Sequence, residues 1–264
     1  MITSIQNPLV KQIRKLHRTK GRRAQNLFLL EGTHLIEAAC EANYPLFSLC
    51  YTEQWQVRYP QLWEDISQKV QRCELVSLEV LGAMATTVNP DGVVATANFQ
   101  PFSNLEIPNL QLGLVLERLQ DPGNLGAIIR TAVATEIDGI WLSDDSVDID
   151  HPKVLRASAG AWFQVPMIVS SSLRETILDC KKAGVNIIAT LPNVTKTYWE
   201  LELTKPTLIL LGNEGAGLSE ALVNLADEKV TIPLSKGVES LNVAIASALI
   251  LYERKRQLRV KNLN

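Results

Sequence analysis

The segment that joins Ile232 to a long apolar run starting at Val243 holds side chains suited to chemistry. It contains a proline, a glycine and an acid, and it ends in Ser240 and Asn242 just before the apolar run. A polar residue in front of an apolar periodic run is typical of a helix N-cap. A helix start offers free backbone N–H groups, which suit a polar ligand. Taken alone, the segment is equally well an ordinary loop and cap.

Two other segments place polar side chains just after an apolar strand. The first has an expected strand at 112–116, a Pro-Gly turn, and a helix that carries Asn124 and Arg130. The second has an expected strand at 207–211 followed by a glycine-rich loop. Glycine in such a loop permits a positive φ and a close approach of the backbone to a ligand. The notable residues of that loop are Gly212, Asn213, Glu214 and Gly217.

In this order and at these distances, the three segments resemble the SpoU/TrmH family of RNA 2′-O-ribose methyltransferases, within the SPOUT superfamily. The family patterns are N-x-G-x-x-x-R, G-N-E-x-x-G and P-x-x-x-x-x-E-S-L-N-V. The matching positions are Asn124, Gly126 and Arg130, then Gly212, Asn213, Glu214 and Gly217, then Pro233 through Val243. The three patterns together are highly specific, and the resemblance covers about residues 110–258. A weaker match at 28–32 resembles the start of the family's substrate-binding domain.

The resemblance implies transfer of a methyl group from S-adenosylmethionine to a ribose 2′-hydroxyl of RNA, with no metal. The cofactor would be held largely by backbone groups at Thr190, Leu191, Gly212, Asn213, Gly217, Ile232 and Leu241. The catalytic site would comprise Arg130, Asn124, Glu214, Ser240 and Asn242. Arg130 would either handle the hydroxyl proton or orient phosphate. Arginine normally stays protonated and is a poor base, so the orienting role is physically easier.

Beyond about residue 110, strands and helices alternate and the strands are continuously apolar. This pattern predicts an α/β fold with a parallel sheet covered on both faces. A nicotinamide-binding Rossmann domain is disfavoured, because no G-x-G-x-x-G follows the first strand. The resemblance implies instead that this domain is tied into a deep trefoil knot. It also implies a homodimer, to which the last helix would contribute Val243, Ala246 and Ile250.

The length of 264 residues is comfortable for two domains. We expect an RNA substrate-binding domain at 1–99, a small α/β layer of ribosomal-protein type, then a linker at 100–109 and a SpoU-type methyltransferase domain at 110–264. Hydrophobic content of 46% and charge of 20% describe a globular protein. No apolar run is long enough to span a bilayer, and the N-terminus lacks a signal pattern, so we expect a cytoplasmic protein. The four cysteines are widely spaced and read as reduced.

The charge distribution favours an RNA partner although the net charge is −2. Residues 1–30 hold seven cations and no acid, and a second basic run lies at the C-terminus. The expected RNA contacts are Arg14, Lys15, Arg18, Arg22 and Arg23, joined by Arg156 and Ser158 of an R-x-S-x-G stretch. A solvated helix face is the alternative for each run. The resemblance favours ribosomal RNA over transfer RNA, the runner-up, because relatives with an N-terminal domain of ribosomal-protein type usually modify ribosomal RNA. A non-catalytic RNA-binding or ribosome-assembly factor on the same fold is a further alternative.

Overall fold

The computed structural model describes residues 1–100, 102 and 107–261. The chain forms two compact units, one from residues 1–100 with 148–164 and the other from the remainder. The sequence predicts a boundary near residue 100 and places 148–164 in the C-terminal domain, whereas in the structure this segment belongs to the N-terminal unit. Within that unit, helix α8 (Pro152–Ser158) packs on β1 (Leu27–Glu31), which accounts for the difference. Of the expected linker, residues 101 and 103–106 lie outside the described ranges.

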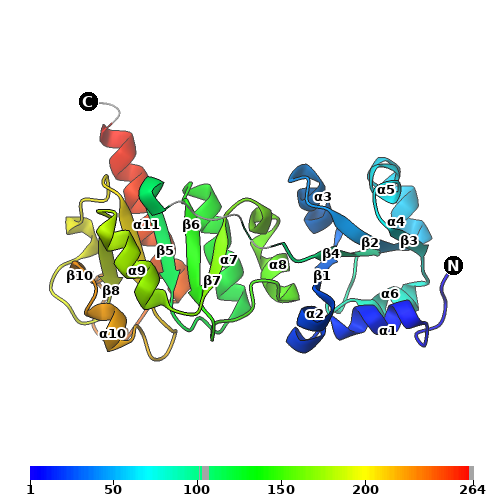
Figure 1. Cartoon of the computed structure of the whole chain (residues 1–264), viewed down its shortest axis with the longest axis horizontal. Coiled ribbons are helices and arrows are strands. Elements are labelled where there is room, and N and C mark those ends of the chain that lie inside the picture. Colours follow the sequence, from blue (N-terminus) through cyan, green and yellow to red (C-terminus); the bar gives the residue numbers. More distant parts are fainter. Residues whose placement is uncertain (101, 103–106, 262–264) are drawn as a thin grey trace. The chain divides into compact units, whose positions relative to one another are not determined.

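The N-terminal unit is built on a four-stranded sheet in the order β1-β4-β2-β3 (Figure 1). Strand β4 (Val93–Asn98) runs antiparallel to β1 and to β2 (Leu46–Tyr51), whereas β3 (Arg72–Leu75) runs parallel to β2. Besides α8, the helices of this unit are α1 (Pro8–Lys15), α2 (Thr19–Gln25), α3 (Thr33–Glu41), α4 (Glu53–Arg58), α5 (Pro60–Ser67), α6 (Leu78–Met84) and the 3₁₀ turn η2 (Ala161–Phe163).

Helix α1 begins with two residues that favour a helix start. The Asn7 side chain accepts a hydrogen bond from the Leu9 N–H, and Pro8 occupies the first turn, where its missing N–H costs nothing. Its apolar side turns inward, where α1 and α6 cover one face of the sheet. The cations of α1 therefore remain on the outer side, since the opposite side is buried.

The C-terminal unit is built on a six-stranded sheet in the order β10-β8-β9-β5-β6-β7, and all its strand pairs are parallel. The strands are β5 (Leu112–Leu116), β6 (Gly139–Ser143), β7 (Met167–Ser170), β8 (Asn186–Thr190), β9 (Thr207–Leu211) and β10 (Glu228–Val230). The helical elements are η1 (Ile107–Asn109), α7 (Pro122–Ala134), α9 (Leu173–Lys182), η3 (Tyr198–Glu200), α10 (Glu220–Val223) and α11 (Val243–Lys261). The parallel α/β prediction is confirmed.

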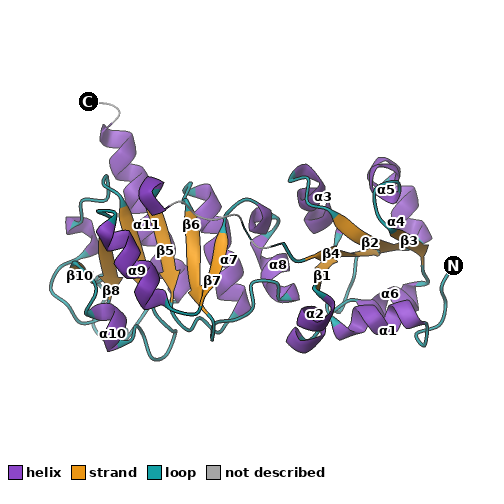
Figure 2. Ribbon diagram, in the orientation of Figure 1, coloured by secondary structure: helices purple, strands orange, loops and turns teal. Residues whose placement is uncertain are grey.

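Helices lie on both faces of this sheet (Figure 2). Successive side chains of a strand point to opposite faces, so Val115, Leu208 and Leu210 share one face, where they pack with Ile177 and Cys180 of α9. Helices α7 and α11 contact each other extensively. The trefoil knot stays a prediction, since strand order and register do not describe how loops thread. No helix in the described ranges combines the length and apolar character that crossing a membrane requires.

The last helix buries two of the three residues that the sequence assigned to a dimer contact, and the third, Ala246, is half-buried and lines the cavity described below. Val243 and Ile250 of α11 are 6% and 0% exposed. These two side chains belong to the core of the unit and are not available to a second copy. The apolar side chains that α11 leaves exposed are Ile245, Leu249 and Tyr252.

Candidate active site

A cavity of about 440 Å³ opens beyond the carboxyl ends of β8, β9 and β10. Its size lies within the range of small-molecule sites. The loops that follow these three strands supply its walls. All seven residues predicted to bind a cofactor line it, namely Thr190, Leu191, Gly212, Asn213, Gly217, Ile232 and Leu241.

The loop after β9 is closed by its own backbone. Asn213 and Gly217 exchange N–H···O hydrogen bonds of 3.1 and 2.9 Å, and the Asn213 Oδ1 accepts from the N–H groups of Gly215 and Ala216. A Cβ at Gly212 would lie 2.1 Å from the Gly217 carbonyl carbon, so only glycine fits there. Gly217 itself has φ +66°. The glycine spacing thus builds a tight hairpin on one wall of the cavity.

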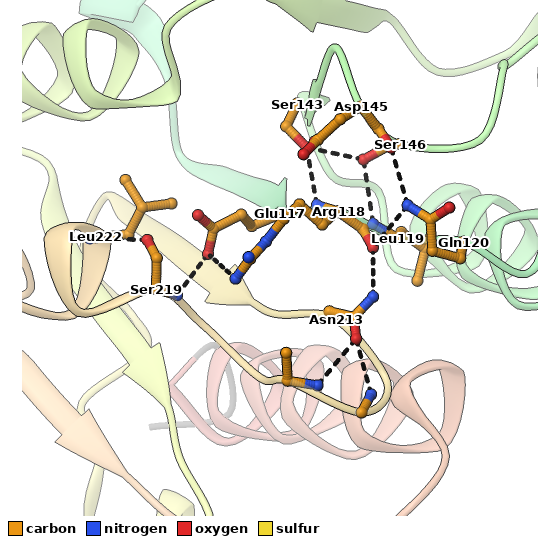
Figure 3. Close-up of polar contacts among 12 residues, drawn as sticks. Glu117, Arg118, Leu119, Gln120, Ser143, Asp145, Ser146, Asn213, Ser219 and Leu222 are labelled. Atoms are coloured by element: carbon orange, nitrogen blue, oxygen red, sulfur yellow. Dashed lines mark hydrogen bonds and ion pairs between the residues drawn. The ribbon is translucent and has the colours of Figure 1, made fainter.

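Asn213 also ties this loop to the ends of β5 and β6 (Figure 3). Its Nδ2 donates to the Arg118 carbonyl at 2.8 Å, and the Arg118 N–H donates to the Ser143 Oγ at 2.8 Å. Arg118 has φ +55°, the left-handed region that a non-glycine residue seldom adopts. A residue keeps such a backbone conformation where neighbouring groups fix it. Here the N–H and the carbonyl of Arg118 are both fixed, by Ser143 and Asn213.

Glu117 provides a second tie between the same loops (Figure 3). Its Oε2 accepts a 2.6 Å hydrogen bond from the Ser219 N–H, where Ser219 caps α10. The Arg118 Nη2 lies 3.9 Å from the same oxygen. Glu117 and Arg118 belong to none of the three sequence patterns and were not predicted as site residues; they directly follow the buried strand β5.

The three motif segments meet in a chain of side-chain hydrogen bonds. The Asn124 Nδ2 donates to the Glu214 Oε1 at 3.0 Å, and the Asn242 Nδ2 donates to the Asn124 Oδ1 at 2.8 Å. The Asn242 Oδ1 in turn accepts from the Ala244 N–H at 2.9 Å, so Asn242 caps the start of α11. Each amide is thereby fixed in orientation by partners on both its oxygen and its nitrogen. Glu214, at one end of the chain, lines the cavity.

The Glu214 carboxylate is held in its charged form. Partial burial opposes ionisation, but hydrogen bonds from Asn124 and from backbone N–H groups, including those of Asp121 and Gln120, outweigh it and lower the pKa of Glu214. A carboxylate that stays ionised accepts hydrogen bonds and does not deliver a proton at neutral pH. The Glu214 carboxylate is therefore suited to hold Asn124 and the turn before α7 in place.

The other two residues predicted for catalysis are placed differently. Ser240 is exposed, lines the cavity and has no side-chain hydrogen bond to a described residue. Arg130 is exposed on α7, does not line the cavity, and makes no hydrogen bond or ion pair within the described ranges. The structure thus joins Asn124, Glu214 and Asn242, sets Ser240 on the cavity wall, and leaves Arg130 at the surface.

The N-terminal basic run divides into free and engaged charges. Arg14, Lys15 and Arg18 are exposed and make no ion pair with a described residue. Arg22 is 1% exposed, and its guanidinium lies 2.6 Å from the Asp148 carboxylate and 3.2 Å from that of Asp150. It is therefore not available to RNA, contrary to the prediction, because the segment 148–164 covers it.

Asp148 has a second partner in Arg23, at 3.0 Å. The Arg23 side chain is 54% exposed and keeps an open side. In the C-terminal run, Arg254 is buried and donates to the carbonyls of Leu203 and Lys205. Neither run is a uniformly solvated face.

The R-x-S-x-G stretch also faces inward. Ser158 is fully buried and donates to the Leu155 carbonyl at 2.7 Å, so its hydroxyl does not face RNA as predicted. Arg156 donates to the Glu31 Oε1 at 2.7 Å and to the Thr86 Oγ1 at 2.6 Å. The pairing holds α8 in the N-terminal unit and leaves Arg156 partly exposed.

The chain matches two protein-family models and resembles known proteins over most of its length. Residues 111–252 match the family model described as the SpoU rRNA Methylase family, and residues 7–95 match the MRM3-like substrate binding domain. A protein of Synechocystis sp. described as an uncharacterized tRNA/rRNA methyltransferase is 50% identical over 256 residues, which cover 97% of this chain and 93% of the relative.

Two further proteins are similar over nearly their whole length. The 23S rRNA (guanosine(2553)-2′-O)-methyltransferase RlmP of Bacillus subtilis is 32% identical over 251 residues, covering 95% of this chain and 97% of the relative. The crystal structure of an AdoMet bound rRNA methyltransferase from Sinorhizobium meliloti matches with a TM-score of 0.87 at 32% identity and covers 97% of each chain.

Proposed function

Because the chain belongs to the SpoU rRNA methylase family, we propose that it transfers a methyl group from S-adenosylmethionine to a ribose 2′-hydroxyl of ribosomal RNA. The observation that carries the proposal is the hydrogen-bonded chain Glu214–Asn124–Asn242, which joins the three motifs at the cavity. The names of the similar rRNA methyltransferases support the ribose 2′-hydroxyl and the ribosomal substrate. We place the reaction in the cytoplasm, where ribosomes assemble.

The cavity residues fit S-adenosylmethionine. The Thr190 hydroxyl is buried and has no hydrogen-bond partner among the described residues, so a bound ligand would satisfy it. Leu191, Ile232 and Leu241 offer aliphatic walls, and Gly212 lets the hairpin after β9 close tightly on one side of the cavity. When bound, the cofactor supplies a methyl group on a sulfonium, which is already a good leaving group.

The residues of the chain then have to position the ribose and help its 2′-hydroxyl to lose a proton. Holding two reactants in line supplies a large part of such catalysis. Asn124 has one amide hydrogen and one oxygen lone pair beyond those used by Glu214 and Asn242, and these suit a ribose or phosphate oxygen. The Arg130 guanidinium offers a planar fork that matches phosphate, so it orients the target nucleotide or stabilises the developing alkoxide.

We further infer that two copies associate through α11. Its exposed apolar side chains Ile245, Leu249 and Tyr252 are 54%, 36% and 53% exposed, and their spacing sets them along one side of the helix. Helix α7, which carries Arg130, packs against α11. In a dimer formed there, Arg130 would reach the cofactor cavity of the second subunit.

Calorimetry and a transfer assay test the proposal. S-adenosylmethionine and its demethylated product should bind with dissociation constants on the order of micromolar, and NAD should not bind. Ribosomal RNA from cells lacking the protein should then accept labelled methyl groups, mapped as 2′-O-methyl ribose. Transfer RNA as the better acceptor would overturn the ribosomal assignment. Cofactor binding without transfer to either RNA would favour a non-catalytic factor.

A further inference from the structure

We propose that a second cavity, in the N-terminal unit, binds one unpaired nucleobase of the RNA substrate. This inference rests on the proposed function, because it takes RNA as the substrate. The cavity has a volume of about 280 Å³ and lies between helix α1 and the face of the sheet beneath it. That volume is near the lower end of the range for small-molecule sites, which suits a single ring system.

The inner wall of the cavity is apolar. Leu9 and Ile13 of α1, with Leu16 at its C-cap, face Leu27 of β1 across it, and all four are at most 6% exposed. Phe47 of β2 is half-buried at the same site and offers an aromatic ring. Protein interiors are normally packed without voids of this size, so an open apolar pocket beside a filled core is suited to a flat apolar ligand.

Two buried hydroxyls in this cavity give the ligand a polar requirement. Ser48 and Thr96 are opposite each other in the register of β2 and β4, and both are 2% exposed. Their oxygens are 2.7 Å apart. Two hydroxyls carry two hydrogens, and the bond between them uses one. The second hydrogen has no acceptor among the described residues, so a ligand with a carbonyl or ring-nitrogen acceptor would satisfy it.

The rim carries side chains that read base edges and phosphates. Gln12 and Gln71 are exposed and present amides, which both donate and accept. The Arg72 side chain is 45% exposed, and its Nε donates to Glu74 at 2.9 Å, which leaves the face of its guanidinium open to a stacked base.

The surroundings of the cavity favour a nucleobase that belongs to an RNA strand over a free metabolite. Lys11 and Lys15 lie on α1 near Gln12, are exposed, and form no ion pair in the described ranges. Such cations attract a phosphate backbone that passes the opening. Single-stranded RNA is recognised by splayed bases that stack on aromatic or guanidinium groups and hydrogen-bond through their edges. A paired base cannot enter, so the ligand is an unpaired one.

The test uses the full chain and fluorescein-labelled octaribonucleotides of uridine, cytidine and adenosine, with a matched RNA duplex. In the double variant Ser48→Ala, Thr96→Val, affinity for at least one single strand should fall about threefold to tenfold, the range for one neutral hydrogen bond. Duplex affinity and S-adenosylmethionine affinity should not change. Ser67→Ala is the control, because its hydroxyl bonds within α5, outside the cavity.

A second variant guards against misfolding of the first. Gln12→Ala combined with Gln71→Ala changes exposed rim residues and should lower the same single-strand affinity by a similar factor. Parental single-strand affinity in both variants would overturn the inference, as would an equal loss for duplex and single strand. If the parent methylates ribosomal RNA while the variants bind like it, the nucleobase site fails and the proposed function stands. A parent that neither binds nor methylates RNA overturns both.

Discussion

Two regions of the molecule hold their polar groups in opposite ways. One is the cavity mouth of the C-terminal unit, by which we mean Glu214, Asn124 and Asn242. The other is the basic surface of the N-terminal unit, by which we mean the exposed Arg14, Lys15 and Arg18. At the mouth, Glu214, Asn124 and Asn242 are bonded to one another and to backbone, so each amide has one orientation. On the basic surface, Arg14 and Arg18 contact no acid in the described ranges. A bonded network fixes where chemistry occurs, whereas free charges attract a polyanion without fixing its register.

The same contrast separates two arginines four positions apart. Arg18 is exposed, and Arg22 is 1% exposed against two carboxylates. The partners of Arg22 come from a segment 126 residues away. Identical side chains in one basic run therefore differ in role because of chain that is remote in sequence.

The largest effect should follow from removal of Arg22. Arg22→Gln leaves the buried Asp150 without its counter-charge and leaves Asp148 with Arg23 alone, which should lower the free energy of unfolding by about 3–5 kcal/mol. Arg18→Gln is the matched control and should stay within about 0.5 kcal/mol of the parent. Urea denaturation measures both. Equal, small effects would mean that the buried pair has no structural role.

Arg130 should affect the reaction and not the fold. Arg130→Ala should lower the rate of methyl transfer by about 10²–10³-fold, the cost of removing a donor aimed at developing charge. Melting temperature and S-adenosylmethionine affinity should be unchanged, since Arg130 contacts no described polar group and no cavity wall. Arg174→Ala removes another exposed arginine and serves as the control.

The lysine variant separates two roles for Arg130. Lysine keeps the charge and loses the planar fork. If Arg130 orients phosphate, Arg130→Lys should lose most activity at every pH. Recovery of activity in alkaline buffer would instead indicate proton transfer, because lysine has the lower pKa. Parental transfer by Arg130→Ala would contradict both roles.

The free charges should be visible in the salt dependence of RNA binding. Replacing Arg14, Lys15 and Arg18 by Gln should reduce the slope of log affinity against log salt by up to about 0.7–0.9 for each phosphate that the variant no longer neutralises. Cofactor affinity, measured by calorimetry, should not change. An unaltered slope would identify these side chains as solvated charges.

The sequence predicted the C-terminal unit more fully than the N-terminal one. The expected strands at 112–116 and 207–211 have the bounds that the structure shows, because continuous apolar runs mark strands buried on both faces. Helix α2 was missed. Its sequence, Thr-Lys-Gly-Arg-Arg-Ala-Gln, has no apolar period, and the side chain it buries is Arg22. Helices α4 and α6 were also missed. Each spans less than two turns, which is too short to show a helical period in the sequence.

For the site, sequence patterns predicted the residues but not their partners. The motifs led to Asn124, Glu214 and Asn242, which the fold brings together. Glu117 and Arg118 escaped notice because two charged residues after a strand carry no pattern of their own. Their role depends on Ser219 and Asn213, about 100 positions later. Contacts of that sequence separation are set by topology, which a local pattern does not encode.

A variant of Arg118 tests what holds the left-handed backbone at this position. The candidates are the hydrogen bonds to its peptide groups and the contact of its side chain with Glu117. Arg118→Gly removes the steric cost of φ +55° but adds freedom to the unfolded chain, so stability should rise by no more than about 0.5–1 kcal/mol. Gly217→Ala, at φ +66°, should instead destabilise by about 1 kcal/mol. Thermal denaturation distinguishes them. Marked destabilisation by Arg118→Gly would show that the guanidinium contact to Glu117 carries the network.

The smallest effect concerns the charge of Glu214. Its pKa is lowered in the folded state despite partial burial, because Asn124 and backbone N–H groups donate to the carboxylate. A lowered folded pKa contributes stability above the unfolded value of about 4.3, and this contribution is lost as pH falls through the folded pKa.

The unfolding free energy of the parent should therefore drop more steeply with acid below about pH 5 than that of Glu214→Gln. The difference should stay within a few tenths of a kcal/mol, since the side chain is exposed and screened by solvent. Urea titrations across that pH range measure it, and coincident pH profiles would contradict it. Glutamine keeps an acceptor for Asn124, so a loss of methyl transfer at neutral pH in this variant would assign the negative charge itself, and not the hydrogen bond, to positioning the cavity mouth.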